Sequence, residues 1–90
     1  MPDSADGLVL LAGPVGTVLA HWTRPSRATR FRVFQLIVGV DDVPVNVKTV
    51  NDPEATLPGL PSGKTVQIFV IAANDAGQAA ASDTVEIAVP

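Results

Sequence analysis

The tripeptide Gly63-Lys64-Thr65 matches the end of a phosphate-binding loop, which would make the chain a nucleotide-binding enzyme. Such a loop needs a glycine five positions before Gly63, and a helix must follow so that its N-terminal N–H groups meet the phosphates. Pro58 occupies the position of that glycine, and the residues after Thr65 alternate like a β-strand. We therefore interpret the tripeptide as a turn between strands.

Residues for nucleophilic or metal-assisted catalysis are also scarce. The chain has no cysteine, and its one histidine, His21, lies between Ala20 and Trp22, on the side of a predicted strand that we expect to face solvent. No EF-hand spacing is present. We predict no catalytic residues, no metal site, no cofactor and no enzymatic activity. The acidic residues are spread over turns, where aspartate caps local N–H groups: Asp41, Asp42, Asp52, Glu54, Asp75 and Asp83.

A basic cluster is the first candidate for binding. Four of the six positive charges lie within nine residues, at Arg24, Arg27, Arg30 and Arg32, although the net charge of the chain is −3. Arginine side chains can hold a carboxylate, a sulfate or an acidic protein surface through paired hydrogen bonds. The alternative is a solvated loop whose charge keeps the protein soluble.

The elements that position these residues are predicted to be strands. Fourteen valines, eight prolines and seven glycines favour β-strands separated by turns, and no segment has a helical period. Seven short strands with frequent turn signals are typical of an all-β, antiparallel two-sheet β-sandwich. We expect strands at 8–12, 17–22, 31–38, 45–50, 55–57, 65–73 and 84–89.

Several strands also have a predicted side or position. Val18, Ala20 and Trp22 share one face of their strand, which we expect to be buried. Pro44 makes the strand at 45–50 an edge strand, since proline cannot donate to a ladder. The residues around Asn74 and Gly77 tolerate positive φ and predict a hairpin turn.

Length and charge limit the remaining possibilities. Ninety residues make one domain, and an apolar content of 47% suffices for a core without disulfides. The mild negative charge argues against nucleic acid as a partner, and no apolar run is long enough to insert into a membrane. We expect residues 1–6 to be a disordered leader and 7–90 to be the folded domain.

The sequence resembles a fibronectin type III domain over nearly its whole length. Trp22, followed by Thr23-Arg24-Pro25 and then Phe31-Arg32-Val33, is similar to the second and third strands of that family. The second half echoes the family pattern L-x-P-G-T-x-Y-x-V-x-V-x-A-x-N-x-x-G. The residues that carry this second match are Leu57, Leu60, Ser62-Gly63-Lys64-Thr65, Val70, Ala72, Asn74, Gly77 and Ser82.

One residue departs from the family. Val66 stands where the family has a tyrosine whose hydroxyl hydrogen-bonds across the corner, and this chain contains no tyrosine. We expect the corner to depend on the restricted backbone of its prolines and glycines and on packing of Leu60, without a side-chain hydrogen bond.

The resemblance also implies two places where partners could bind. In the family's topology the arginine loop shares one pole with the hairpin loop that begins at Asn74, so the candidate partner-binding residues are Arg24, Arg27, Arg30, Asn74 and Asp75. The third and sixth strands are neighbours in this fold. Their outward apolar residues, Phe34, Leu36, Phe69 and Ile71, then form a candidate contact face. The alternatives are a bulge near 36–38 that shifts the register, or cover by the stem of Arg32.

The family suggests a non-catalytic protein-interaction or spacer module in a larger secreted or cell-surface protein, with a bacterial multidomain protein as the source. Its partners would be neighbouring domains and an unidentified protein or glycan. One alternative is a self-associating structural module that uses the apolar outer face. The other is an accessory module of a polysaccharide-degrading enzyme, which binds an anionic or glycan ligand through the arginine-rich loop.

Overall fold

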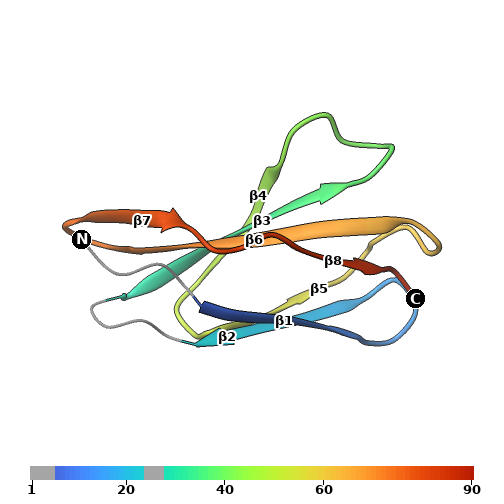
Figure 1. The fold of residues 1–90 in the computed structure, drawn as a ribbon. Coiled ribbons are helices and arrows are strands. Elements are labelled where there is room, and N and C mark those ends of the chain that lie inside the picture. Colours follow the sequence, from blue (N-terminus) through green and yellow to red (C-terminus); the bar gives the residue numbers. More distant parts are fainter. Residues whose placement is uncertain (1–5, 24–27) are drawn as a thin grey trace.

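The structure is a computed structural model that describes residues 6–23 and 28–90 (Figure 1). No helix in this part of the chain is long and apolar enough to span a membrane. The strands are β1 (Asp6–Ala12), β2 (Val18–Thr23), β3 (Arg30–Ile37), β4 (Val45–Val50), β5 (Glu54–Leu57), β6 (Thr65–Asn74), β7 (Gly77–Ala81) and β8 (Val85–Ala88).

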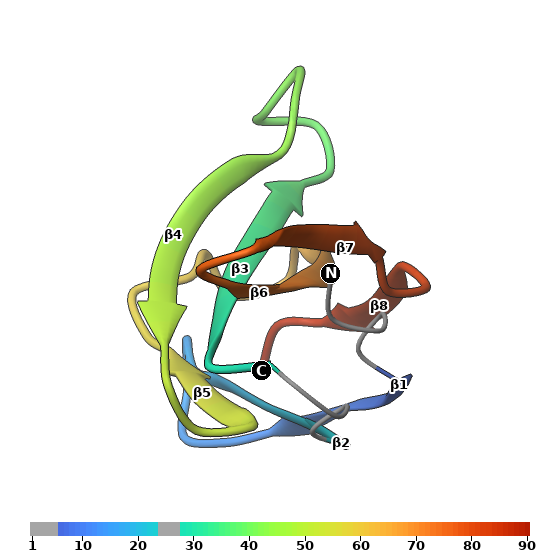
Figure 2. The same ribbon diagram turned by 90° about the vertical axis from the view of Figure 1, so that its left-hand side faces the viewer.

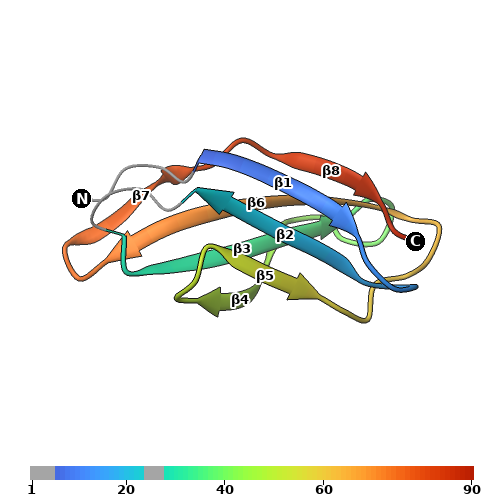
Figure 3. The ribbon, with the colours of Figure 1, turned by 90° about the horizontal axis from the view of Figure 1, so that it is seen from below.

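The strands form two stacked antiparallel sheets, which Figures 2 and 3 show from the end and from below. One sheet has the order β1-β2-β5. In the other sheet the order is β4-β3-β6-β7, and β8 pairs with β6 beyond the end of β7. The predicted two-sheet sandwich is therefore confirmed, and the strand at 45–50 is an edge strand as Pro44 indicated.

The described residues form eight strands where seven were predicted, because β7 is a separate strand that precedes the predicted last strand at 84–89, now β8. Both β7 and β8 pair with β6, and Ser82 bridges the interval between them. The Ser82 N–H donates to the Val70 carbonyl at 2.8 Å, and the Ser82 hydroxyl accepts from the Val70 N–H at 2.9 Å. The backbone polar groups of this buried valine are thus satisfied where the ladder is interrupted.

The core lies between the sheets and follows the alternation of the strands. Val18, Ala20 and Trp22 are buried, as predicted from their shared face. The ring of Trp22 meets Phe31 edge to face, with 5.3 Å between centroids. The largest fully buried side chains are Phe31, Ile68, Val18, Val33, Val66 and Val70.

The corner before β6 is held by backbone hydrogen bonds. The Leu60 N–H donates to the Gly16 carbonyl at 2.9 Å, and the Gly63 N–H donates to the Val89 carbonyl at 3.1 Å. Val66 packs wholly inside the core. The expectation of a corner without a side-chain hydrogen bond is wrong, because the Ser62 hydroxyl donates to the Pro90 carbonyl.

Strand boundaries agree with the predicted ones to within two residues. Asp6, which the sequence assigned to the leader, is the first residue of β1, whereas residues 1–5 lie outside the described part. The β3–β4 hairpin projects away from the body of the sandwich (Figures 1 and 2). At its turn the Ile37 N–H donates to the Asp41 carboxylate at 3.0 Å, so Asp41 caps the end of β3.

Gly16, in the β1–β2 turn, contacts the corner before β6 and should be harder to replace than Gly59 of the corner itself. Its φ is +76°, and a Cβ there would lie 3.0 Å from the Leu60 carbonyl oxygen, whereas Gly59 has φ +71° and open space around it. We expect Gly59→Ala to lower the free energy of unfolding by about 1–2 kcal/mol, the cost of the left-handed backbone conformation. Gly16→Ala should cost at least ~1 kcal/mol more, because the backbone must also shift.

Urea unfolding followed through the fluorescence of Trp22 measures both free energies. Gly59→Ala is the matched control for backbone conformation alone. Equal losses in the two variants would contradict the contact between Gly16 and Leu60.

Candidate functional site

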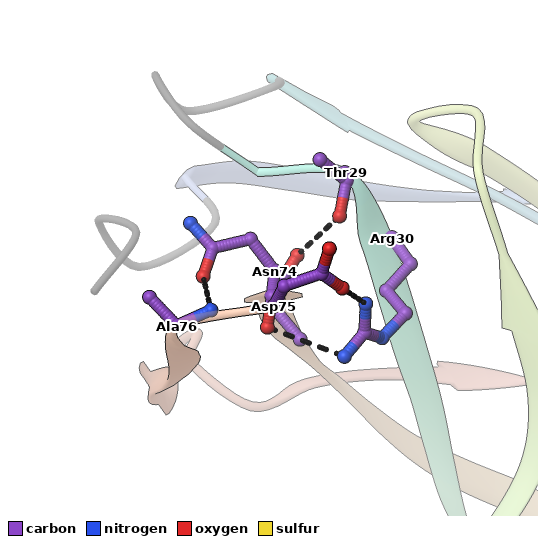
Figure 4. A network of polar contacts seen from close by, with 6 residues as sticks. Thr29, Arg30, Asn74, Asp75 and Ala76 are labelled. Atoms are coloured by element: carbon purple, nitrogen blue, oxygen red, sulfur yellow. Dashed lines mark hydrogen bonds and ion pairs between the residues drawn. The ribbon is translucent and has the colours of Figure 1, made fainter.

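Three of the five candidate loop residues meet at one pole of the sandwich. The Arg30 guanidinium, at the start of β3, lies beside the β6–β7 turn (Figure 4). Its Nη1 lies 3.4 Å from Asp75 Oδ1, and its Nη2 donates to the Asn74 carbonyl at 3.2 Å. The structure thus brings Arg30, Asn74 and Asp75 together, while Arg24 and Arg27 lie outside the described residues.

The turn itself is shaped by Asn74 and by the segment before β3. The Asn74 side-chain carbonyl accepts from the Ala76 N–H at 2.8 Å, the local bond that makes asparagine favourable in turns. Thr29 donates to the Ala73 carbonyl through its N–H at 2.9 Å. Its hydroxyl donates to the same carbonyl at 3.4 Å (Figure 4). These contacts fix where Arg30 enters the sheet.

Among the described residues of this pole, the charges of Arg30 and Asp75 offset each other at the surface. The Asp75 side chain is fully exposed and that of Arg30 is 35% exposed, so their ion pair contributes little to stability in water. An incoming anion would have to displace the Asp75 carboxylate from Arg30. Within residues 6–23 and 28–90, no three His, Cys, Asp or Glu side chains are grouped to hold a metal ion.

The predicted apolar contact face lies on the outer side of the five-stranded sheet. Phe34 pairs directly with Phe69 across β3 and β6, and their rings stack with 5.0 Å between centroids and 6° between planes. Leu36 and Ile71 flank this pair on the same side, and Arg32 is the partner of Ile71. All four apolar residues point outward as predicted, but each is half-buried.

A bulge does interrupt this sheet, although at another place than 36–38. The β3–β4 ladder shifts between Val33 and Phe34, which pair with Lys48 and Asn46, so Val47 is the extra residue. The β3–β6 ladder runs without a shift, which is why Phe34 keeps its outward direction.

Sequence reasoning missed the apolar character of the projecting β3–β4 hairpin. The signal was present as valines that continue through the turn and into an edge strand, where burial cannot be complete. The exposed valines of this hairpin are Val38, Val40, Val43, Val45 and Val47.

A groove of about 470 Å³ lies beside edge strand β4, at the turn that connects β4 to β5. Leu11, Leu19 and Val50 supply apolar lining, and Asp52 and Glu54 supply carboxylates. No sequence motif could reveal it, because its residues come from four strands and one turn. His21, Lys48 and Thr56 also line it, together with Ala20 and Ala55.

Comparison with known proteins finds similarity in structure alone. The chain matches no family model and no curated protein sequence. It is similar to part of the twitchin kinase region of C. elegans, with a TM-score of 0.88 and 17% identity over 99% of this chain. The match covers only 17% of the twitchin chain and falls on its fibronectin type III part, so it does not extend to the kinase.

Two single domains match along nearly their whole length. The FN5 domain of Drosophila Lar has a TM-score of 0.82 and 16% identity, and the match covers 100% of this chain and 98% of that domain. The sixth fibronectin type III domain of human fibronectin type III domain containing protein 3 has a TM-score of 0.83 and 18% identity, over 100% and 87% of the two chains. The chain described here therefore has the fibronectin type III fold.

Proposed function

We propose that this chain is a non-catalytic module that spaces or joins other domains of a larger protein. The observation that carries the proposal is the path of the chain, which enters the sandwich at one end and leaves it at the other. Asp6 pairs with Thr23, at the end of β1 that lies away from the β1–β2 turn. Pro90 lies at that turn, because its carbonyl accepts from the Gly16 N–H at 2.9 Å.

The shape of the domain supports the same role. Its extents are 38 × 25 × 17 Å, and the strands run along the long direction (Figure 3). A domain that passes the chain from end to end holds its neighbours apart, unlike a domain with adjacent termini. The matched part of the twitchin region is likewise one segment of a longer chain.

The compartment and the source are proposals that rest on the family resemblance. The fold occurs in extracellular and surface proteins, and also in intracellular twitchin, so it favours no compartment. An extracellular or surface location and a bacterial source are what the family resemblance suggests for this chain. An anionic or glycan ligand at the arginine loop has less support, since Arg30 is engaged by the β6–β7 turn.

The spacer role can be tested with fluorescent protein domains fused to both ends of the chain. We expect low energy transfer, because the two ends leave from opposite poles. In the matched control the first reporter is inserted in the β1–β2 turn at Val15, beside the exit of Pro90, and transfer should rise. Equal transfer in the two arrangements would rule out the spacer role.

A second candidate function is self-association through the outer face that contains Phe34 and Phe69. The stacked rings are half-buried in the isolated chain, and a second copy could cover them. This reading predicts a sedimentation coefficient that rises with protein concentration.

Phe69→Lys should abolish that rise, because a charge in the ring stack would be desolvated by the contact. Val15→Lys is the control, since Val15 is 82% exposed in a turn away from the face. A wild-type chain that remains monomeric at millimolar concentration would contradict self-association.

A further inference from the structure

We propose that the free edge of β4 binds an extended, basic segment of another polypeptide by β-strand addition. The proposal rests on the proposed function as a joining module and names the chemistry of the partner. The charged contacts to the partner would be Asp42, which precedes β4, and Asp52, which follows it. The apolar contacts would be the exposed valines of the β3–β4 hairpin.

The backbone of β4 has one side that faces no other strand of the described residues. Among residues 6–23 and 28–90, β4 pairs only with β3, so the other side of the strand presents N–H and C=O groups that an added strand can satisfy. Proteins often protect such an edge with a lysine. In β4 the Lys48 Nζ donates to the Thr56 carbonyl of β5 at 2.8 Å, and Pro44 and the bulge at Val47 also protect part of the edge, so an added strand would pair with the regular residues beside the bulge.

Exposed apolar side chains along the edge of β4 could form hydrophobic contacts with a partner strand. Val43, Val45 and Val47 are 66%, 45% and 38% exposed, on a hairpin that projects beyond the sandwich (Figure 2). Val38 and Val40 continue the exposed apolar surface around the turn. An added strand would bury part of this surface against its own side chains.

The groove at the far end of β4 suits a long basic side chain. Leu19 and Val50 can pack against the aliphatic stem of lysine or arginine, and the carboxylates of Asp52 and Glu54 can hold its charged end. Lys48 also lines the groove and donates to the neutral Thr56 carbonyl, so its positive charge offsets one of the two carboxylates and leaves the other for a basic partner.

The charges around β4 also decide between a second copy and a different partner. Asp42 precedes the strand and Asp52 follows it, and both are exposed. The ion pair found among the described residues joins Arg30 to Asp75 and involves neither of them. Antiparallel pairing of two β4 strands would place Asp42 of each copy near Asp52 of the other, so like charges oppose self-pairing. A basic strand has the complementary charge.

The test uses two synthetic peptides with the same centre, acetyl-Lys-Val-Thr-Val-Lys-amide and acetyl-Glu-Val-Thr-Val-Glu-amide, titrated into the ¹⁵N-labelled chain. We expect the lysine peptide to shift the amide signals of 45–50 and to bind about tenfold more tightly than the glutamate peptide, as expected for several exposed charge contacts of ordinary strength. The double variant Asp42→Lys with Asp52→Lys should reverse this preference.

The matched control variant is Asp83→Lys with Glu86→Lys, which makes the same charge change on exposed residues at the opposite edge of the sheet. It should retain the preference for the lysine peptide. Three results would each overturn the proposal. The first is equal binding of both peptides, and the second is a set of amide shifts centred on the Arg30 pole or on the Phe34 face. The third is a set of β4 shifts that depend on protein concentration in the absence of peptide. If the lysine peptide does not bind, the energy transfer between the fused reporters is still expected to be low. The failure of strand addition can therefore be distinguished from the failure of the spacer role.

Discussion

Strand β6 is the element on which the rest of the structure depends, because three other strands pair with it. β3 lies along one side for eight residues, and β7 and β8 share the other side. Its inward residues Val66, Ile68 and Val70 are completely buried against the opposing sheet. Strict alternation then forces Phe69 outward, so one strand sets both the core and the candidate contact face.

The corner that leads into β6 shows how the fold forms without the tyrosine typical of the family. Val66 fills the core position, and hydrogen bonds from the corner to Gly16, Val89 and Pro90 close the end of the sandwich. These contacts also hold the C-terminal residues at the pole opposite Asp6. The path of the chain that supports a spacer role is therefore a consequence of the corner.

Much of the fold could be predicted because each strand alternates clearly. Val18, Ala20 and Trp22 are buried, and Phe34 points outward, as the two-residue period requires. Strand β7 was missed because its sequence, Gly-Gln-Ala-Ala-Ala, has no clear alternation of apolar and polar side chains. The bulge at Val47 and the groove beside β4 depend on how separate strands meet, which local patterns do not contain. For the arginine loop, sequence pattern and family topology predicted that Arg30 lies near Asp75. They did not predict that the Arg30 guanidinium contacts the β6–β7 turn.

The central role of β6 can be measured most directly by hydrogen exchange of the native protein. Amides of residues 66–72 should exchange only through global unfolding, with free energies that match urea unfolding and fall with it in Gly16→Ala. Amides of the edge strand β4 should exchange through local openings of lower free energy, since one ladder protects them. Exchange from residues 66–72 as fast as from 45–50 would contradict this account.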